Sequence, residues 1–171
     1  MKRWVAFGVV GLAIVVAVVA VLARSPGPTR ARTTGPAAAP SGLDPLIEEF
    51  RATERTSITR FNDLLRQQRE QSIDELELAN IIERDVLTQW RALRTRVEAA
   101  RAQDELYSTL RRYIEARQLS WEAYVTALRA ASDEAAKPHY EAHRQKNAEA
   151  QEEAKHLGRL FREAADRAGA K

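Results

Sequence analysis

The first pattern along the chain is an uninterrupted apolar run, residues 4–23, with no charged or strongly polar side chain. A helix of about 20 apolar residues spans the roughly 30 Å hydrocarbon core of a bilayer. Lys2 and Arg3 precede the run, which is typical of a signal anchor and of a cleavable signal peptide. The length favours the anchor because signal-peptide cores have about 7–15 residues, while cleavage before Arg24 stays an alternative. We therefore predict a single transmembrane helix within residues 1–23.

The pattern changes at residue 24. Residues 24–42 hold four of the six prolines and no large apolar side chain, so they cannot bury enough area to fold. We predict a Pro/Ala/Gly-rich disordered linker. In a polyproline II conformation, at about 3.1 Å per residue, it would span up to roughly 60 Å.

From residue 43 onward, apolar residues recur every three or four positions, which is the period of an amphipathic helix. Asp44 followed by Pro45 is an N-cap with proline at the first helical position. Ser72 followed by Glu75 has the spacing of a capping box. The predicted helices cover about residues 44–70, 73–102, 104–136 and 138–168.

This domain, residues 43–171, has helices of similar length and short connections, which favour an antiparallel, up-down four-helix bundle. The predicted fold class is therefore all-α, with a long helical coiled coil as the alternative arrangement. No glycine or proline marks a turn near residues 102–104, so one continuous helix over 72–136 also stays open. Pro138 is expected to end whichever helix precedes it.

The apolar stripe of the second predicted helix includes Leu76, which is therefore expected in the core. The last helix instead presents a narrow seam of alanines, which allows close packing but buries little area. Polar residues also fall at core positions, where they can fix register and oligomeric state. These polar seam residues are Glu54, Ser57, Asn80, His143 and Asn147.

Charge is distributed unevenly along the chain. Five of the 27 basic residues lie in the first 42 positions, where there is no acid, so the rest of the chain has 22 basic and 24 acidic residues. A nearly neutral domain offers little phosphate neutralisation, and we predict no nucleic-acid partner. The chain has no cysteine, which excludes disulfides, thiolate metal sites and a cysteine nucleophile.

His139 and His143 are the candidate metal ligands, because residues four apart lie on one face of a helix at a chelating distance. No catalytic motif accompanies them, and neither a nucleophile elbow nor a phosphate-binding loop is present. We therefore predict a protein that is not an enzyme and has no cofactor. Aromatic side chains at core spacing are either packing residues or the lining of a ligand pocket between helices. They are Trp90, Tyr107, Tyr113, Trp121 and Tyr124.

The sequence predicts a membrane-anchored, non-enzymatic helical bundle that acts through protein contacts, as an adaptor, scaffold or assembly factor. One alternative is a ligand- or metal-sensing bundle that signals through a partner, and a second is a periplasmic chaperone. The expected location is the inner membrane with the C-terminal domain in the periplasm, because a basic N-terminus ahead of an apolar run favours N-inside orientation. A protein partner is expected, and a homo-oligomer is possible.

Overall fold

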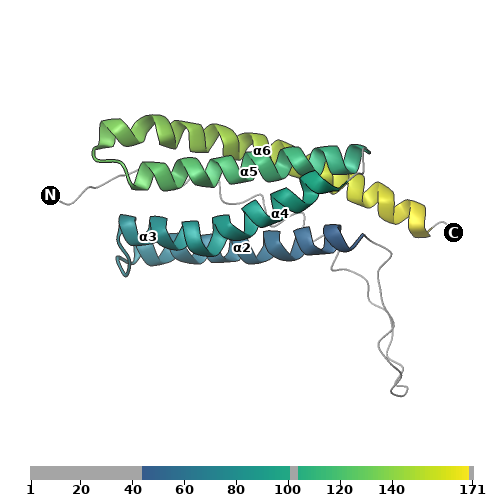
Figure 1. Ribbon diagram of the computed structural model, residues 1–171, viewed down its shortest axis with the longest axis horizontal. Coiled ribbons are helices and arrows are strands. Elements are labelled where there is room, and N and C mark those ends of the chain that lie inside the picture. Colours follow the sequence, from purple (N-terminus) through teal and green to yellow (C-terminus); the bar gives the residue numbers. More distant parts are fainter. Residues whose placement is uncertain (1–43, 101–103, 170–171) are drawn as a thin grey trace, which may run out of the picture. The chain divides into compact units, whose positions relative to one another are not determined.

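The computed structural model describes residues 44–100 and 104–169, which form helices and turns without a strand. The predicted all-α class is confirmed for these residues. None of their helices is both long enough and apolar enough to cross a bilayer. The predicted anchor and linker lie outside the described residues. The helices are α2 (Pro45–Arg69), α3 (Glu75–Ile81), the π-helix η1 (Ile82–Leu87), α4 (Thr88–Ala99), α5 (Glu105–Leu128) and α6 (Asp133–Gly169) (Figure 1).

Helix α2 begins as predicted, with Asp44 as its N-cap and Pro45 in its first turn. The Asp44 carboxylate accepts hydrogen bonds from the Leu46 backbone N–H at 2.9 Å and from the Tyr107 hydroxyl at 2.6 Å. This second bond ties the start of α2 to the start of α5. It also raises the pKa of Tyr107, to about 12, although burial of the phenol is the larger cause.

The end of α2 is closed by backbone hydrogen bonds from Gln71 and Ser72 to the carbonyl oxygens of Gln68 and Gln67, both at 3.0 Å. This is the Schellman arrangement, which needs a left-handed residue just beyond the helix. Gln71 occupies that position with a φ of 58°. A residue with a Cβ is strained there, so this turn is made without the glycine that usually marks it.

The capping box predicted at Ser72 is wrong. The N-cap of α3 is Asp74, whose carboxylate accepts from the Glu77 N–H at 2.7 Å, whereas the Ser72 hydroxyl donates back to the α2 carbonyl of Gln67 at 2.8 Å. The helix therefore starts at Glu75, and Leu76 falls in its exposed first turn. Leu76 is 58% exposed, which corrects its predicted place in the core.

Helices α3, η1 and α4 follow one another without an intervening turn. The wider π-helical turn changes which positions face inward, so the adjacent residues Val86 and Leu87 are both fully buried. Buried Ile82 and Trp90 continue the same face on either side of them. The turn also directs Asp85 toward α2, where it accepts from Arg60 at 2.8 Å.

Between α4 and α5 the structure has the break that the sequence left open, since α4 ends at Ala99 and α5 begins at Glu105 after the N-cap Asp104.

The boundary predicted at residues 136–138 is wrong. Helix α5 already ends at Leu128, and α6 begins at Asp133, capped by a bond from the Ala135 N–H to the Ser132 hydroxyl at 3.2 Å.

Pro138 lies inside α6, not between two helices. It is the sixth residue of that helix, so its missing N–H removes one backbone bond close to the N-terminus, where the helix has few preceding turns to disturb. The helix start is therefore set by the Ser132 cap and by acidic Asp133 and Glu134 in the first turn, and proline at the sixth position does not end the helix.

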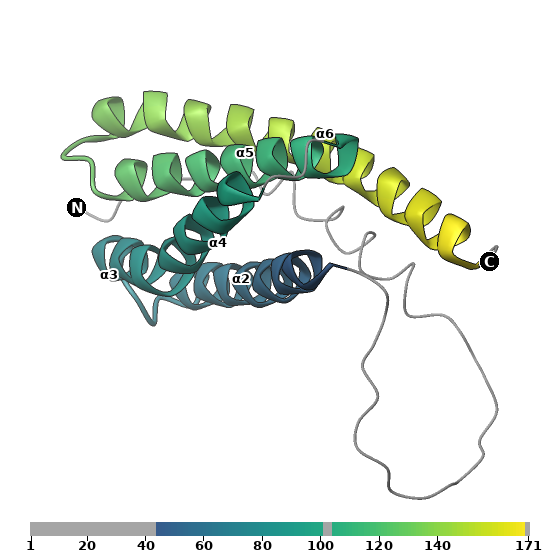
Figure 2. The ribbon, with the colours of Figure 1, turned by 45° about the vertical axis from the view of Figure 1, so that its right-hand side comes forward.

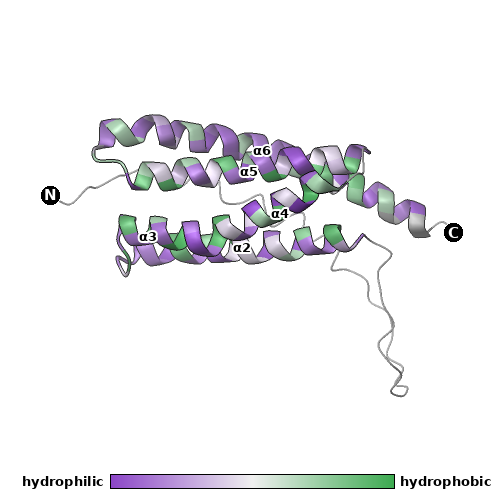
Figure 3. Cartoon of the chain, viewed as in Figure 1, coloured by the Kyte–Doolittle hydropathy of each residue, from purple (hydrophilic) through white to green (hydrophobic). Residues whose placement is uncertain are grey.

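The α3–η1–α4 segment packs on both α2 and α5, and the described helices share one buried apolar cluster (Figure 2). Among the described helices, α5 is the one whose backbone lies close to that of α6, and α6 runs back along it. Small buried side chains, Ala116 and Ser120 on α5 and Ala150 on α6, permit this approach. Figure 3 shows that α6 is mostly hydrophilic with scattered apolar positions, as the alanine-rich seam predicts.

Candidate functional site

Polar side chains from three helices meet inside the apolar core. The Tyr113 hydroxyl donates to the Glu54 carboxylate, linking α5 to α2. Arg117 Nη1 donates to Asn147 Oδ1 at 2.6 Å, linking α5 to α6. Arg117 is only 4% exposed, and its guanidinium carbon lies 5.6 Å and 5.7 Å from the ring centroids of Tyr113 and Trp121. We call Glu54, Tyr113, Arg117 and Asn147 the core polar layer.

Two aromatic contacts bracket this layer along the α2–α5 interface. Phe50 packs edge-on against Tyr113 with ring centroids 5.7 Å apart, and Phe61 packs on Trp121 at 5.5 Å. Glu54 and Ser57 lie between Phe50 and Phe61 on α2, as Arg117 lies between Tyr113 and Trp121 on α5. The carboxyl group and the guanidinium therefore occupy the same level of the core.

Burial is the main influence on the ionisation of this layer. It raises the pKa of Glu54 above its usual range, while the Tyr113 hydrogen bond and the positive charges of Arg117 and Arg51 act in the opposite direction. Burial and the neighbouring Glu54 carboxylate together raise the pKa of Tyr113. Half-buried Glu54 and buried Arg117 are thus groups of opposite charge at one level of the core, and each hydrogen-bonds to a different residue, Glu54 to Tyr113 and Arg117 to Asn147.

Several buried polar atoms have no hydrogen-bond partner within the described part of the chain. They are Ser57 Oγ, Trp90 Nε1, Gln118 Oε1, and Nε and Nη2 of Arg117. A buried polar group left unpaired costs about 1–3 kcal/mol, and more if it is charged. The polar layer therefore reduces the stability that apolar packing would give, and its benefit is the single register it imposes on α2, α5 and α6.

A second polar contact joins α5 to α6 nearby. His143 Nδ1 lies 2.9 Å from both the hydroxyl and the carbonyl oxygen of Ser120, and the Ser120 hydroxyl lies 3.2 Å from the His143 carbonyl oxygen. If the proton is assigned to Nδ1, the imidazole donates to the Ser120 carbonyl and the Ser120 hydroxyl donates to the His143 carbonyl. Each residue then satisfies a backbone acceptor on the other helix.

The environment of His143 favours its neutral form. Burial is the largest cause of its lowered pKa, the positive charges of Arg117 and Arg144 lower it further, and the bond to the Ser120 carbonyl opposes them. The ring also lies 5.0 Å from that of Tyr124, at an angle of 42°. His143 is therefore placed as a neutral packing and hydrogen-bonding residue of the α5–α6 interface.

The predicted metal ligands His139 and His143 both lie on α6, one turn apart. Within residues 44–100 and 104–169, the structure brings no group of three or more His, Cys, Asp or Glu side chains into position for a metal ion. One ring nitrogen of His143 is already engaged by Ser120. A metal site at this pair stays a prediction.

The candidate aromatic residues are packed against one another. Trp90 meets Trp121 edge-on at 5.1 Å and Tyr113 at 6.0 Å, and Phe61 also contacts Tyr124 at 5.7 Å. These edge-to-face contacts are typical of core packing. Of the two interpretations that the sequence allows, this arrangement matches core packing.

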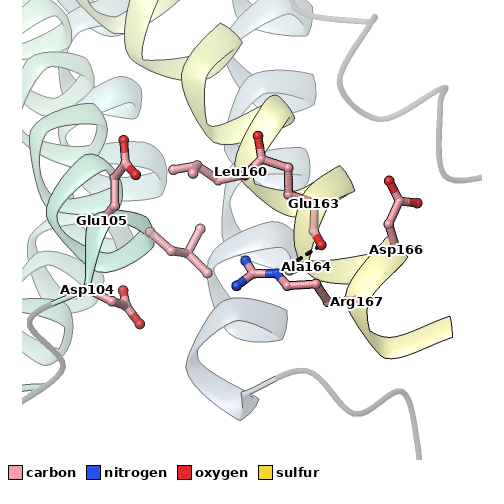
Figure 4. A pocket seen from close by; sticks show the side chains of 8 residues that line it. Asp104, Glu105, Leu160, Glu163, Ala164, Asp166 and Arg167 are labelled. Atoms are coloured by element: carbon pink, nitrogen blue, oxygen red, sulfur yellow. Dashed lines mark hydrogen bonds between the residues drawn. The ribbon is translucent and has the colours of Figure 1, made fainter. Parts of the chain in front are cut away.

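An open groove lies between the start of α5 and the C-terminal turns of α6 (Figure 4). Leu106, Leu160 and Ala164 contribute its apolar part, while acidic side chains and Arg167 surround them. Arg167 is held by a bond from its Nε to the Glu163 carbonyl oxygen at 3.2 Å. The acidic residues of the lining are Asp104, Glu105, Glu163 and Asp166.

Arg117 is the functional candidate that sequence reasoning missed. Arginines usually lie at the surface, and the sixteen other arginines of the described residues are exposed or partly exposed, so the residue type gave no signal. Its position did give one, because it lies three or four residues from core positions Tyr113, Ile114, Ser120 and Trp121. Comparison of the chain with protein-family models, with curated proteins and with solved structures finds no match.

Proposed function

We propose that this chain is a membrane-anchored, non-enzymatic helical bundle that acts through protein contacts outside the cytoplasm, as an adaptor, scaffold or assembly factor. The observation that carries the proposal is the order of segments. The apolar run of residues 4–23 is followed by the proline-rich residues 24–42 and then by a helical domain. Such an order suits a protein that holds a binding domain at a distance from a bilayer.

An up-down, antiparallel order of the four helices is part of this proposal. Ion pairs and a hydrogen bond between helices support it. In an antiparallel pair of helices, a residue near the end of the first helix meets a residue near the start of the second. Arg60 pairs with Asp85, whereas Arg96, farther along the chain than Asp85, pairs with Glu49. The Arg112–Glu153 and Arg117–Asn147 pairs follow the same rule between α5 and α6.

The described surface favours polar contacts with a partner. Arg91 bridges Glu83 at 2.6 Å and Glu122 at 2.9 Å, and Glu83 also binds Arg129 at 3.2 Å. Among the described residues, Leu76 is the large apolar side chain that is exposed. A chaperone needs exposed apolar area for its clients, so these features support the adaptor over that alternative.

Membrane retention tests the anchor. The variant Val15→Arg/Val16→Arg places two charges in the middle of the apolar run, at about 2.5–3.5 kcal/mol each. We expect it to leave the membrane fraction after alkaline extraction, whereas the matched Val15→Leu/Val16→Leu variant stays. Recovery of the native chain in the aqueous fraction, shortened at residue 24, would contradict the anchor.

The absence of cysteine makes the orientation equally testable. Ala148 is exposed on α6, so an Ala148→Cys chain should react in intact cells with a maleimide that does not cross the cytoplasmic membrane. Labelling only after lysis would place the domain in the cytoplasm. Crosslinking in membranes then separates an adaptor, with one dominant partner, from a chaperone, with many.

A further inference from the structure

The C-terminal end of α6 projects beyond the start of α5 (Figure 1). The carboxylate of Glu105, the first residue of α5, lies 3.0 Å from His156 Nε2 of α6. Residues 157–169 of α6 follow this contact, and they add roughly 20 Å of helix at about 1.5 Å per residue. The last turns of α6 therefore extend past the helix against which the rest of α6 packs.

One side of this projecting end is covered, and another side is open. Phe161 is buried, and the guanidinium carbon of Arg51 from α2 lies 4.5 Å from its ring centroid. Leu160 and Ala164 line the open groove instead, together with Leu106 of α5 (Figure 4). A groove that is open to solvent suits a segment of a partner chain better than an enclosed small ligand.

The groove has an excess of negative charge. Arg167 is the cation of its lining, and its Nε donates to the backbone carbonyl oxygen of Glu163 at 3.2 Å. Within the described part of the chain, the carboxylates of Glu163 and Asp166 form no ion pair. Glutamates that lie between other helices are paired with arginines. The four carboxylates of the lining, which we call the acidic rim, are those of Asp104, Glu105, Glu163 and Asp166.

The contacts of the acidic rim leave this charge in place. Asp104 Oδ1 accepts the Tyr107 N–H at 2.9 Å as the N-cap of α5, and a backbone donor does not cancel a full charge. Arg159 and Arg162 lie on the same turns of α6 and are exposed, but they are not part of the lining. The groove therefore combines an apolar part with carboxylates that have no arginine partner.

We propose that this groove is a docking site for a basic amphipathic helix of a partner protein. Such a helix places apolar side chains, spaced by three and four residues, into an apolar groove. Lysines or arginines beside that stripe complement the acidic rim. The inference rests on the proposed function, because it names the surface and the partner chemistry through which the helical domain acts.

The charge of the groove also separates this partner from other occupants. A second copy of the chain that presented the same groove would bring like charges together, which is unfavourable. Anionic lipid head groups attract basic protein segments, so an acidic rim repels them. A partner segment with basic side chains is the occupant that both the apolar part and the acidic rim favour.

Peptide binding to the full chain in nanodiscs of zwitterionic lipid tests the site. The probe is a fluorescent helical peptide of about 15 residues, with leucines at steps of three and four and lysines elsewhere. Its control has the same composition with the leucines dispersed around the helix. After subtraction of binding to empty nanodiscs, we expect the first peptide to bind at least about tenfold more tightly. Equal binding of the two peptides, or no binding, would refute the docking site.

Matched charge variants locate the binding. Glu163→Lys/Asp166→Lys reverses two charges of the acidic rim and should weaken binding of the first peptide at least about tenfold. Glu134→Lys/Glu141→Lys makes the same change in net charge at exposed positions nearer the start of α6, and should weaken it less than about threefold. Equal losses in the two variants would indicate non-specific attraction and overturn the proposal.

Substitutions of alanine test the apolar part of the groove. Ala164 belongs to the lining, whereas Ala148 is exposed elsewhere on α6. Ala164→Gln should weaken binding several-fold and Ala148→Gln should leave it unchanged, with circular dichroism as the check on folding. An unchanged affinity in Ala164→Gln would contradict the apolar contact. Disulfide-linked dimers that form with Ala164→Cys and not with Ala148→Cys would assign the groove to a second copy and also overturn the proposal.

The docking site and the membrane anchor can fail separately. A chain that stays in the membrane fraction but binds both peptides equally has the anchor and lacks the docking site. A chain recovered in the aqueous fraction that still prefers the first peptide has the docking site and lacks the anchor.

Discussion

Replacing Arg117 by methionine tests whether Arg117 and Glu54 of the core polar layer stabilise each other as a charge pair. The substitution removes the hydrogen bond to Asn147 and the cation over the rings of Tyr113 and Trp121, while an unbranched apolar side chain fills much of the same space. What remains is half-buried Glu54, which keeps the Tyr113 hydrogen bond and the positive charge of Arg51 but loses that of Arg117. The perturbation therefore acts mainly through a residue that is not mutated.

The expected cost at pH 7 is about 3 kcal/mol in the free energy of unfolding. Removing one partner of a buried ion pair typically costs about 3–5 kcal/mol. The lower end applies because Glu54 can take up a proton instead of staying charged. The double variant Glu54→Gln/Arg117→Met leaves neither charge and should recover to within about 1 kcal/mol of the native chain, so it should be about 2 kcal/mol more stable than Arg117→Met alone.

The pH dependence gives the sign of the effect. The pKa of Glu54 is raised in the folded protein, so its contribution to stability is present below the usual carboxyl value of 4.5 and is lost as the pH rises through the raised value. Without Arg117 this pKa rises further. The cost of Arg117→Met should therefore be largest near neutral pH and smaller below pH 4.5, where Glu54 is protonated in both folded and unfolded chains.

Urea unfolding of the full chain in detergent, followed by helical circular dichroism at several pH values, measures this cost. Arg112→Met is the matched control on the same helix, because Arg112 is half exposed and binds Glu153 at 2.8 Å. It should cost less than about 1 kcal/mol. Equal costs for the two arginine variants, or a double variant no more stable than Arg117→Met, would refute the buried-pair reasoning.

Three further outcomes are expected from thermal or urea unfolding of the same preparation. Gln71→Gly should stabilise the chain by about 1 kcal/mol, because glycine adopts the left-handed conformation at φ 58° without strain; a loss of stability would contradict the strain. Ala150→Leu should cost about 1–3 kcal/mol by overpacking the α5–α6 interface, while exposed Ala148→Leu should change little. Tenfold excess Zn²⁺ tests the metal-sensing alternative, because a rise in the melting midpoint that His139→Ala removes would support it and an unchanged midpoint would end it.

Periodicity predicted the helices well because most of the core consists of large apolar side chains at steps of three and four. Ile82, Val86, Trp90, Leu93 and Val97 are all buried as their spacing predicts. The period says nothing about where a helix starts, however, since that depends on which polar residue caps it.

The boundary errors therefore have local causes. Asp74 caps its helix where Ser72 matched the expected pattern, and Ser132 caps its helix where Pro138 was the expected boundary. Gln71 makes a turn that usually requires glycine, and Pro138 is accepted near a helix start, so neither residue marked its boundary in the usual way. Each of these choices is decided by backbone hydrogen bonds that the sequence does not display.

The core polar layer was partly predictable. The helical spacing alone places Glu54 and Asn147 as polar residues on the inward faces of their helices. What the sequence could not supply was the identity of their partners. Glu54 contacts a tyrosine 59 positions later, and Asn147 contacts an arginine 30 positions earlier.

These pairings indicate why the chain keeps charged and polar groups inside its core. Apolar faces of helical period pack in more than one register, whereas a carboxyl group, a guanidinium and an amide pack well only where they meet. Shifting α6 by one turn along α5 would leave Arg117 opposite another residue and separate Ser120 from His143. The layer thus selects one arrangement of a helix whose alanine seam alone would allow several.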